Sequence, residues 1–510
     1  MNAATAAEMR QLDERTIAER GISSRELMES AGLAVAKIIL SRFAPARVAV
    51  FCGKGNNAGD GFVAARALYQ QGIAVRVLCM EPESALKGDA AHAFAALAGT
   101  GIDIMPWPDW LVDVGNPPDI IVDALLGTGL RGTPADNYAL AVKIINGAKK
   151  PVVAVDVPSG VGDDMGAEPA AVQATVTVTI GLPKVCLLTW PGAKFAGEVV
   201  VEPIQFPRDL LGSSKIRQNV ATKEELLHWL PSRPGNANKG TFGKVGILAG
   251  SASYAGAAIL CARGALRTGC GLAYMFSTPR LNAIYKAALP EAITVLSGTE
   301  TDDHLGLPAA KLADEMQSRL DVLAVGPGLD FGDDQGQMLA QVLETWRKPL
   351  VLDASALTML AEHKTIPKFS GRAVLTPHPG EMARMLGVKV SDVLLDRFES
   401  VRKMADMYEA VVVSKGASPL VCEPGGQVWI APGAVPALAK GGTGDVLTGV
   451  IASFIAQGAK PLPATVLAVW AHLEAGKKAA ISKGTRGVLA SDVADAVPLV
   501  LDELEFSGEH

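Results

Sequence analysis

The chain has 510 residues, more than one hydrophobic core usually serves, so we expect two domains. Its net charge of −6 and the lack of a basic block argue against nucleic-acid binding, and no apolar run is long enough to span a membrane. The six cysteines are scattered, the seven histidines show no zinc spacing and the N-terminus has no secretory signal, so we expect a cytoplasmic protein with free thiols.

The first 210 or so residues alternate apolar strands with amphipathic helices. Helices are expected over residues 5–19, 24–43, 62–71, 85–99 and 137–147. Strands are expected over residues 47–52, 74–80, 119–126, 174–181 and 197–201, with a further strand and turn over 151–160. This alternation is typical of an α/β domain built on a parallel sheet.

Three of these strands end in loops rich in glycine, amide and acidic side chains. The first loop, over residues 53–61, carries Asn57, the second follows Asp123 and the third carries Asp156. Because the carboxyl ends of parallel strands meet at one edge of a sheet, these side chains are expected to converge there. The first loop has neither the GxGxxG nor the Walker spacing, and a plain polar turn is the alternative.

Three motifs in these loops resemble the NAD(P)H-hydrate epimerase family, also called the YjeF N-terminal domain: Asn56-Asn57-x-Gly59-Asp60-Gly, Asp123-Ala-Leu-x-Gly127-Thr-Gly and Asp156-Val-Pro-Ser159-Gly. The resemblance implies a Rossmann-like three-layer domain over residues 1–212, usually dimeric, that binds potassium and hydrated NADH or NADPH. It implies potassium ligands at Asn57, Asp123 and Ser159. It implies nucleotide contacts at Asn56, Asn57, Ala58, Gly59, Asp60, Gly127, Thr128, Gly129, Leu130, Arg131, Gly132, Thr133 and Asp156.

Two residues are candidates for acid–base chemistry at C6 of the nicotinamide ring. Asp156 precedes Ser159 on the same turn, so it can face the ring while Ser159 holds the ion. Lys184 is the second candidate. The alternative for Asp123 is that it caps a helix or pairs with Arg131.

A stretch without periodicity near residues 211–219 is the expected linker to a second module. Helices are expected there over residues 223–231 and 259–268, and strands over 245–249, 273–276, 322–325, 350–352 and 410–413. His378 lies between two prolines that fix its backbone, which favours a ligand contact over core packing. Lys415 could neutralise a phosphate group or be a solvated surface lysine.

The second module is organised around Gly441-Gly442-Thr443-Gly444-Asp445, which leads into an apolar segment with helical spacing. Glycine lets the backbone approach an anion closely, and a helix N-terminus adds partial positive charge. A carboxylate there is suited to take a proton from a hydroxyl that attacks a phosphoryl group, so Asp445 is the candidate base. An ordinary glycine turn with Asp445 as N-cap is the alternative.

With Gly250-Ser-x-x-Tyr-x-Gly256-Ala257, Gly326-Pro-Gly328, Thr376-Pro-His378-Pro-Gly-Glu381 and Lys415-Gly416, this loop resembles the C-terminal YjeF domain, the ADP- or ATP-dependent NAD(P)H-hydrate dehydratase. The resemblance implies a ribokinase-like α/β domain over residues 223–505. It implies substrate contacts at Ala257, Gly328, His378 and Asp445. It implies nucleotide contacts at Lys415, Gly416, Ala417, Ser418, Pro419, Gly441, Gly442, Thr443 and Gly444. The chain departs from the family pattern at Asn238, Lys244 and Ser355.

Both resemblances in one chain imply a bifunctional enzyme that repairs hydrated NADH and NADPH. The first domain would interconvert the R and S epimers, and the second would dehydrate the S form with ADP or ATP as phosphate donor. Potassium and magnesium are the implied ions, the magnesium bridging the donor phosphates, and a homo-oligomer is the expected state. Two alternatives stay open: a small-molecule kinase with the same ribokinase-like fold, and a module that binds nucleotides without turnover.

Overall fold

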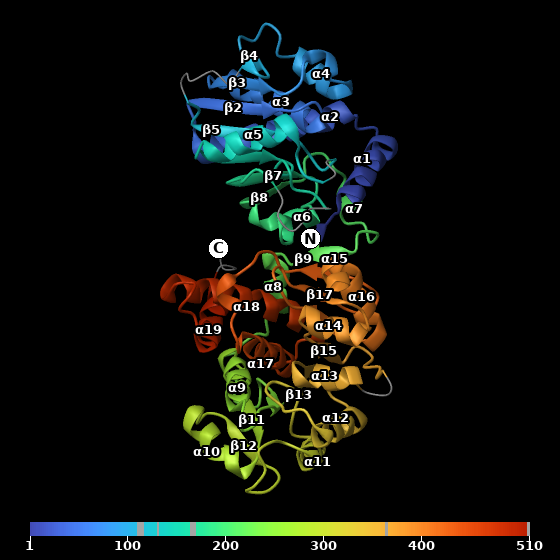
Figure 1. The fold of residues 1–510 in the computed structure, drawn as a ribbon, viewed down its shortest axis with the longest axis vertical. Helices are drawn as coiled ribbons and strands as arrows, with labels where there is room; N and C mark the ends of the chain where they lie inside the picture. The colour runs from blue at the N-terminus through green and yellow to red at the C-terminus, as the bar shows by residue number, and fades with distance from the viewer. Residues whose placement is uncertain (110–116, 130–131, 164–169, 363–365, 507–510) are drawn as a thin grey trace. The chain divides into compact units, whose positions relative to one another are not determined.

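The protein is described from a computed structural model, which covers residues 1–109, 117–129, 132–163, 170–362 and 366–506. Its contacts divide the chain into two compact units, Met1–Gln218 and Asn219–His510. Figure 1 colours the first unit from blue to green and the second from green to red. Within the described residues, no helix combines the length and apolarity that a membrane span needs.

The first unit is built on a parallel sheet with the strand order β4-β3-β2-β5-β6-β7-β8. The strands of this sheet are β2 (Arg47–Cys52), β3 (Ala74–Cys79), β4 (Asp103–Pro106), β5 (Ile120–Ala124), β6 (Val152–Val155), β7 (Val176–Ile180) and β8 (Glu198–Glu202), and the short strand β1 (Asn2–Ala3) lies outside it. The helices are α1 (Ala6–Arg20), α2 (Ser24–Phe43), α3 (Asn56–Gln70), α4 (Gly88–Ala95), α5 (Asp136–Gly147), α6 (Val185–Leu188) and α7 (Arg208–Leu211).

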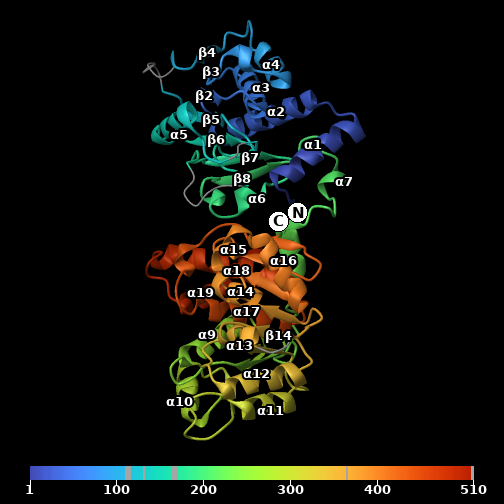
Figure 2. The same cartoon turned by 45° about the vertical axis from the view of Figure 1, so that its right-hand side comes forward.

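Alternate residues of β2 face opposite layers of helices, as the period of two in a strand requires. Val48, Val50 and Cys52 pack in one cluster with residues of α2, α3 and α4. Ala49 and Phe51 pack in another cluster with α5. The first unit therefore has three layers, which Figures 1 and 2 show from two directions.

Helix α3 begins at Asn56, inside the stretch that the sequence analysis assigned to a turn over residues 53–61. The difference arises because Gly59 and Gly61 allow α3 to pack closely against α2 and β5, whereas the sequence analysis placed these glycines in a turn. A Cβ at Gly59 would lie 2.5 Å from Sδ of Met28 on α2, and a Cβ at Gly61 would lie 2.5 Å from Cβ of Ala124 on β5. Asn57 thus sits in the first turn of a helix, where the helix dipole is positive.

The second unit is built on a larger sheet with the strand order β18-β17-β16-β15-β14-β13-β10-β11-β12. Strands β10 to β16 pair in parallel, and β17 and β18 are antiparallel additions at one side. The strands are β10 (Lys244–Leu248), β11 (Leu272–Ser277), β12 (Ile293–Leu296), β13 (Val322–Val325), β14 (Leu350–Leu352), β15 (Ala373–Leu375), β16 (Val411–Ser414), β17 (Leu420–Cys422) and β18 (Val428–Ile430).

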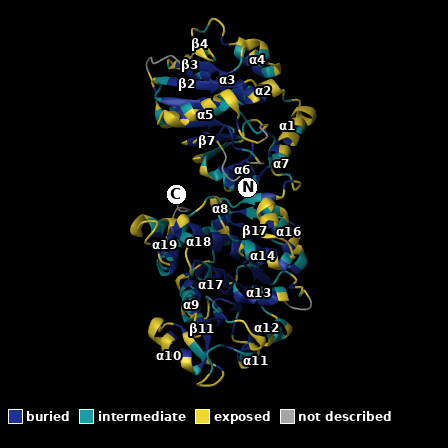
Figure 3. Ribbon diagram, in the orientation of Figure 1, coloured by how far each residue is buried: buried dark blue, intermediate teal, exposed yellow. Residues whose placement is uncertain are grey.

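Helices cover both faces of this second sheet (Figures 1 and 2). The apolar cluster on one face joins strand residues such as Val245, Ala324 and Val413 to helices α9, α17, α18 and α19, and Figure 3 shows the strands as buried. The helices are α8 (Lys223–Trp229), α9 (Ala255–Arg267), α10 (Pro279–Ala288), α11 (Leu307–Glu315), α12 (Asp333–Thr345), α13 (Ser355–Glu362), α14 (Pro379–Leu386), α15 (Val390–Leu395), α16 (Arg397–Tyr408), α17 (Thr443–Ala456), α18 (Pro461–Lys483) and α19 (Ala490–Phe506).

The stretch near residues 211–219, expected as a linker, packs in part against the first unit. Ile216 is 4% exposed and joins Leu210, Met9 and Leu12 in one apolar cluster. The side-chain amide of Asn2 donates hydrogen bonds to the carbonyls of Leu211 (2.9 Å) and Ser213 (3.2 Å). The first unit therefore continues past residue 212 to Gln218, where β9 (Gln218–Val220) begins.

Candidate active sites

A cavity of about 690 Å³ opens at the carboxyl ends of the strands of the first unit. Its wall includes loops that follow β2, β5 and β6, with helix α1 contributing as well. Ligands bind at this edge in open α/β sheets. The predicted residues that line it are Asn56, Asn57, Asp60, Gly127, Thr128, Gly129, Asp156 and Lys184. Leu130 and Arg131 lie outside the described residues.

The three predicted potassium ligands lie side by side in a chain of hydrogen bonds. The Asn57 amide donates to the carbonyl of Leu126 (3.1 Å), and the Ser159 hydroxyl lies 3.2 Å from the same oxygen. Asp123 accepts from the Ser159 hydroxyl (2.6 Å) and from the Ser159 backbone N–H (2.7 Å). Strand ends that are far apart in sequence thus converge at one point.

Asp123 is fully buried, and within the described part of the chain no cationic side chain forms an ion pair with it. Burial raises the pKa of Asp123 to about 6, although the hydrogen bonds from Ser159 oppose this shift. A buried carboxylate amid neutral oxygens suits a large monovalent cation better than magnesium, which requires octahedral geometry and retains water. The alternative partner, Arg131, lies outside the described residues.

Asp156 and Lys184 form an ion pair at the wall of the cavity. The Lys184 ammonium donates to Oδ1 of Asp156 and to the carbonyl of Ile180 (2.5 Å), and its side chain is 3% exposed. Asp156 has a φ of 62°, a region that non-glycine residues rarely occupy and that often marks a functional site. The backbone N–H of Ile180 also donates to Oδ1 of Asp156 (3.1 Å).

Asp13 is a cavity residue that the sequence analysis did not identify. It lies on α1, is half-buried and faces the cavity together with Asp60 and the Asp156–Lys184 pair. Burial raises the pKa of Asp13 to about 6, with the Lys184 charge opposing and the Asp156 charge adding to the shift. Burial and the charges of Asp156 and Asp13 also raise the pKa of Asp60. An aspartate on an amphipathic helix looks like a solvated position in sequence.

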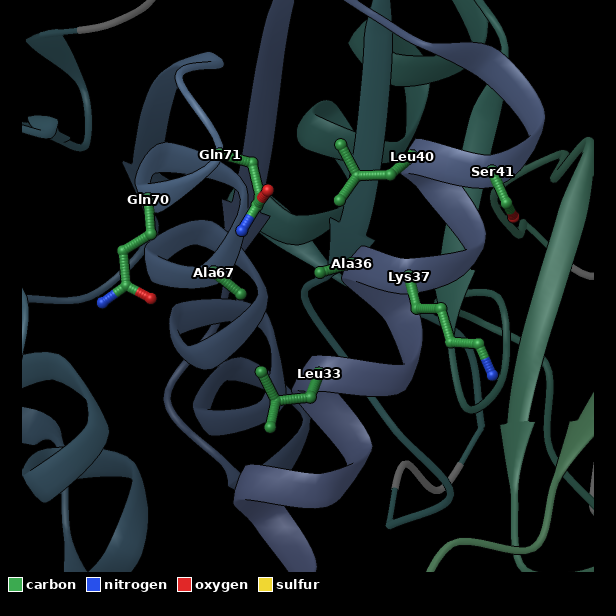
Figure 4. Close-up of a pocket in the computed structure, with 8 residues that line it drawn as sticks. All are labelled: Leu33, Ala36, Lys37, Leu40, Ser41, Ala67, Gln70 and Gln71. Atoms are coloured by element: carbon green, nitrogen blue, oxygen red, sulfur yellow. The ribbon is translucent and has the colours of Figure 1, made fainter.

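A second hollow in the first unit, of about 510 Å³, lies between α2 and α3 (Figure 4). Its lining is aliphatic and amide-rich, and Lys37 is its charged residue. It contains no pair of groups suited to proton transfer, so the cavity at the strand ends is the candidate active site of this unit. The residues of the hollow are Leu33, Ala36, Lys37, Leu40, Ser41, Ala67, Gln70 and Gln71.

In the second unit, the glycine-rich loop leads into α17 as predicted, with Gly442 at the N-cap. Gly442 has a φ of 92°, and a Cβ there would lie 2.6 Å from Cδ1 of Leu260, so the position requires glycine. Asp445 lies in the first turn of α17, where the backbone N–H groups have no intrahelical acceptors. The N-cap alternative for Asp445 is therefore wrong, because Gly442 holds that position.

A buried ion pair lies next to this loop. Lys415 follows β16 and Asp353 follows β14. The Lys415 ammonium donates to Oδ1 of Asp353 (2.7 Å). The Thr448 hydroxyl of α17 donates to Oδ2 of the same carboxylate (2.8 Å). A Cβ at Gly444 would lie 3.6 Å from the Lys415 ammonium, so Lys415 is at the loop rather than on the surface.

These charges set the protonation of Asp445. Burial raises the pKa of Asp445 to about 7, and the Asp353 charge adds to the shift while the Lys415 charge opposes it. Burial alone would also raise the pKa of Asp353, but the Lys415 ammonium and the hydrogen bonds to Asp353 hold it below its usual value. At neutral pH the site thus has an ionised Asp353 and an Asp445 that titrates.

His378 caps the N-terminus of α14 and stays exposed. Its Nδ1 accepts from the N–H groups of Gly380 (3.0 Å) and Glu381 (3.3 Å), so the neutral ring carries its proton on Nε2. Burial and the Lys415 charge lower the pKa of His378. Its side chain is 57% exposed, and its Nε2 lies 3.5 Å from Oε1 of Glu381.

Arg397 fixes the predicted nucleotide loop, residues 415–419, and was not identified from the sequence. Its guanidinium donates to the carbonyls of Ala417 (2.8 Å), Ser418 (3.1 Å) and Ser414 (3.3 Å). Burial lowers the pKa of Arg397. Because these contacts join α16 to the loop after β16, no local sequence pattern reveals them.

Ala257 and Gly328, two predicted substrate contacts, lie against each other. Gly328 has a φ of 65°, and a Cβ there would lie 2.7 Å from Cβ of Ala257. Ser355, which departs from the family pattern, donates to the carbonyl of Leu329 (2.5 Å) and so supports the same loop. His472 is buried as a packing residue, and its Nε2 donates to the carbonyl of Thr443 (2.9 Å) in the glycine-rich loop.

The sequence of the chain is similar to two protein families and to known enzymes. Residues 24–186 match the family described as YjeF-related protein N-terminus, and residues 245–499 match the family described as NAD(P)H-hydrate dehydratase. The bifunctional NAD(P)H-hydrate repair enzyme Nnr of Moorella thermoacetica is 36% identical over 98% of this chain and 97% of its own length. The enzyme of the same name from Escherichia coli is 34% identical over 94% of this chain and 90% of its own length.

Two solved structures resemble part of the chain. The ADP/ATP-dependent NAD(P)H-hydrate dehydratase of Bacillus subtilis, co-crystallised with ATP and Mg²⁺, is 33% identical with a TM-score of 0.50, and the match covers 56% of this chain and 98% of that chain. A ribokinase-like superfamily protein of Enterococcus faecalis is 24% identical with a TM-score of 0.50, covers 56% of this chain and 96% of that one, and indicates the fold alone.

Proposed function

The chain belongs to the bifunctional NAD(P)H-hydrate repair enzymes, and from this premise we propose how its two units divide the chemistry. The enzyme interconverts the R and S forms of hydrated NADH and NADPH and dehydrates the S form with ADP or ATP. We assign epimerisation to a domain over residues 1–212 and dehydration to a domain over residues 223–505. The first compact unit continues beyond residue 212 to Gln218.

The observation that carries the second assignment is the place of Asp445, in the first turn of α17 directly after Gly444 and close enough to the Lys415–Asp353 pair for both charges to shift its pKa. Asp445 takes the proton of the C6 hydroxyl, while the backbone N–H groups of Gly441–Gly444 and Lys415 hold the phosphoryl group. The C6 oxygen bonds to the phosphoryl group as the P–O bond to the nucleotide breaks. Phosphate, a far better leaving group than hydroxide, then departs with the electrons of the C6–O bond, and loss of a proton from C5 restores the C5–C6 double bond. The substrate rests on Ala257, Gly328 and His378.

Magnesium bound together with the nucleotide would neutralise negative charge on its phosphates in this unit. Within the described residues, no group of three or more histidine, cysteine or acidic side chains could hold a metal ion alone. This fits an ion that is held mainly by phosphate oxygens and water. The Arg397-braced loop, residues 415–419, supplies the remaining nucleotide contacts together with Gly441–Gly444.

In the first unit, oxygens of Asn57, Asp123 and Ser159 would hold potassium, which would supply a positive charge beside the buried Asp123. Among the predicted contacts to the hydrated nucleotide, Asn56, Asn57, Asp60 and residues 127–129 line the cavity and support this role. Asp156, oriented by Lys184, is the proton-transfer group at C6. We also infer a homo-oligomer that works in the cytoplasm; light scattering after size-exclusion chromatography tests the assembly.

The test of the function is an assay of the whole chain with hydrated NADH and either ADP or ATP. Repair restores the absorbance of the dihydronicotinamide ring and releases free phosphate, and both epimers are consumed. A small-molecule kinase would instead accumulate a phosphate ester, and a binding module would give no turnover. Omission of the nucleotide should stop dehydration and leave the exchange of the two epimers intact.

A further inference from the structure

Epimerisation at C6, the function proposed for the first unit, sets a demand that one proton-transfer group does not meet. C6 bears both the ring nitrogen N1 and a hydroxyl group, so the electron pair of N1 can expel the hydroxyl as water once it is protonated. Water must then add from the other face. One group must donate a proton on the first face, and another must accept a proton on the second.

The cavity offers these two groups from different elements. The Asp156–Lys184 pair reaches it from the strand ends, whereas Asp13 reaches it from helix α1. Met9, Arg10, Asp13 and Ile17 of α1 all line the cavity, so Asp13 is the carboxyl group that this helix contributes to it, with Arg10 one turn before it.

Helix α1 is held firmly in this position. Met9 and Leu12 are buried in the cluster with Leu182 and Phe206. A capping box between Thr5 and Glu8 fixes its first turn. The backbone N–H of Ala6 also donates to Asp163 (2.7 Å) in the loop that follows β6. Asp13 is thus on a rigid element, as proton transfer to a bound substrate requires.

We propose that Asp13 is the second catalytic acid–base group of the epimerase, acting on the ring face that Asp156 does not serve. Asp13 as the acid donates its proton to the C6 hydroxyl; the C6–O bond breaks, water leaves and the N1 electron pair forms the N1=C6 bond. A water molecule then adds to C6 from the other face. Its O–H proton passes to Asp156, and the electron pair returns to N1.

The step balances without any oxidant or further reactant, because one water leaves and one enters. The enzyme ends with Asp13 deprotonated and Asp156 protonated, which is the state required for the reverse reaction. Exchange with solvent restores the starting state. The raised pKa of Asp13, about 6, is consistent with a group that both gives and takes protons near neutral pH.

The experiment compares Asp13→Asn with Glu14→Gln in the full chain, in water enriched in ¹⁸O. Glu14 is the next residue on the same helix, is exposed and does not line the cavity, so its variant removes the same charge beside the site. Chromatography separates the epimers, and mass spectrometry counts ¹⁸O at C6. Thermal unfolding followed by circular dichroism reports whether each variant is folded. Rates are taken above the reaction without enzyme.

We expect the wild-type chain to place one solvent oxygen at C6 per epimerisation. Asp13→Asn should lower the epimerisation kcat by roughly 100-fold, the scale of a positioned acid or base, with a small change in KM. Asp13→Glu should recover part of the rate, and Glu14→Gln should act as wild type. Any of three results would overturn the proposal: a near-normal epimerisation rate in Asp13→Asn, an equal loss of rate in Asp13→Asn and Glu14→Gln, or no ¹⁸O at C6 of the product. A wild-type chain without epimerase activity would instead refute the proposed function.

Discussion

The carboxylate of Asp353 is 1% exposed, and the Lys415 ammonium lies 2.7 Å from its Oδ1. This pair links the ends of β14 and β16 beneath the glycine-rich loop. Because Asp353 takes the hydrogen bond from the ammonium, Asp445 feels the positive charge only at longer range. The second unit therefore places one permanent carboxylate and one titrating carboxylate in the same site.

Replacement of Asp445 by asparagine should remove the base and keep the shape of the loop. We expect a loss of roughly 100-fold or more in the dehydration rate, the usual scale for a positioned general base, with nucleotide affinity retained. Single-turnover kinetics and equilibrium titration with ADP measure the two quantities. Retained ADP affinity is the control for folding of the second unit, and near-normal dehydration would rule Asp445 out.

The dehydration rate should depend on pH through Asp445. Its pKa of about 7 lies above the usual value, so the group is protonated below pH 7 and cannot accept the hydroxyl proton. We expect kcat/KM to rise with pH through about 7 and then level off. Asp353→Asn removes a charge that adds to the raised pKa of Asp445, so its midpoint should move to lower pH. An unmoved midpoint would show that another group controls the profile.

Replacement of Asp123 by alanine should abolish the response of the first unit to potassium. In the wild type, bound potassium should raise the melting temperature, by an amount equivalent to about 2.7 kcal/mol when its concentration is 100 times Kd. Choline chloride at equal ionic strength controls for salt. Epimerisation by the variant should fall roughly tenfold or more, while dehydration stays unchanged. A variant that still responds to potassium would place the ion elsewhere.

Replacement of Arg397 by lysine should weaken nucleotide binding more than catalysis. Lysine keeps the charge but cannot reach the three carbonyls at once, so the loop over residues 415–419 loses its brace. Loss of one such bond corresponds to about a tenfold rise in KM for ADP, with kcat nearly constant. Arg402→Lys, on the same helix with one bond to the carbonyl of Gly426, is the matched control. Equal effects of both variants would indicate a general loosening of α16.

Local patterns in the sequence predicted the regular elements of the two sheets well. The helix expected over residues 24–43 and the strands expected over 47–52, 322–325 and 350–352 have the observed limits, because polar and apolar periods and capping residues change sharply there. Strands β4, β12, β15, β17 and β18 were not predicted, since strands of three or four residues are too short to show a clear period.

The side chains that act at a distance could not be predicted in the same way. Arg397 and Asp13 look like ordinary polar positions on amphipathic helices, and only the folded chain shows that one meets the loop after β16 and the other lines a cavity. Asp353 was visible as the end of a strand, but its bond to Lys415 joins residues 62 positions apart. Such partners depend on the crossing of elements, which sequence periods do not encode.

The first half of α17 packs closely against α9. At two glycines, one on each helix, the backbones approach so closely that no side chain would fit between them. A Cβ at Gly449 would lie 1.9 Å from the carbonyl oxygen of Cys261, and one at Gly264 would lie 2.5 Å from the carbonyl oxygen of Val446. Helices α9, which carries Ala257, and α17, which carries Asp445, therefore move together as one rigid body. Any movement that accompanies nucleotide binding must therefore occur in residues 415–419, the loop to which Arg397 donates its hydrogen bonds. Structures solved with and without ADP should superpose on α9 and α17 and diverge at residues 415–419.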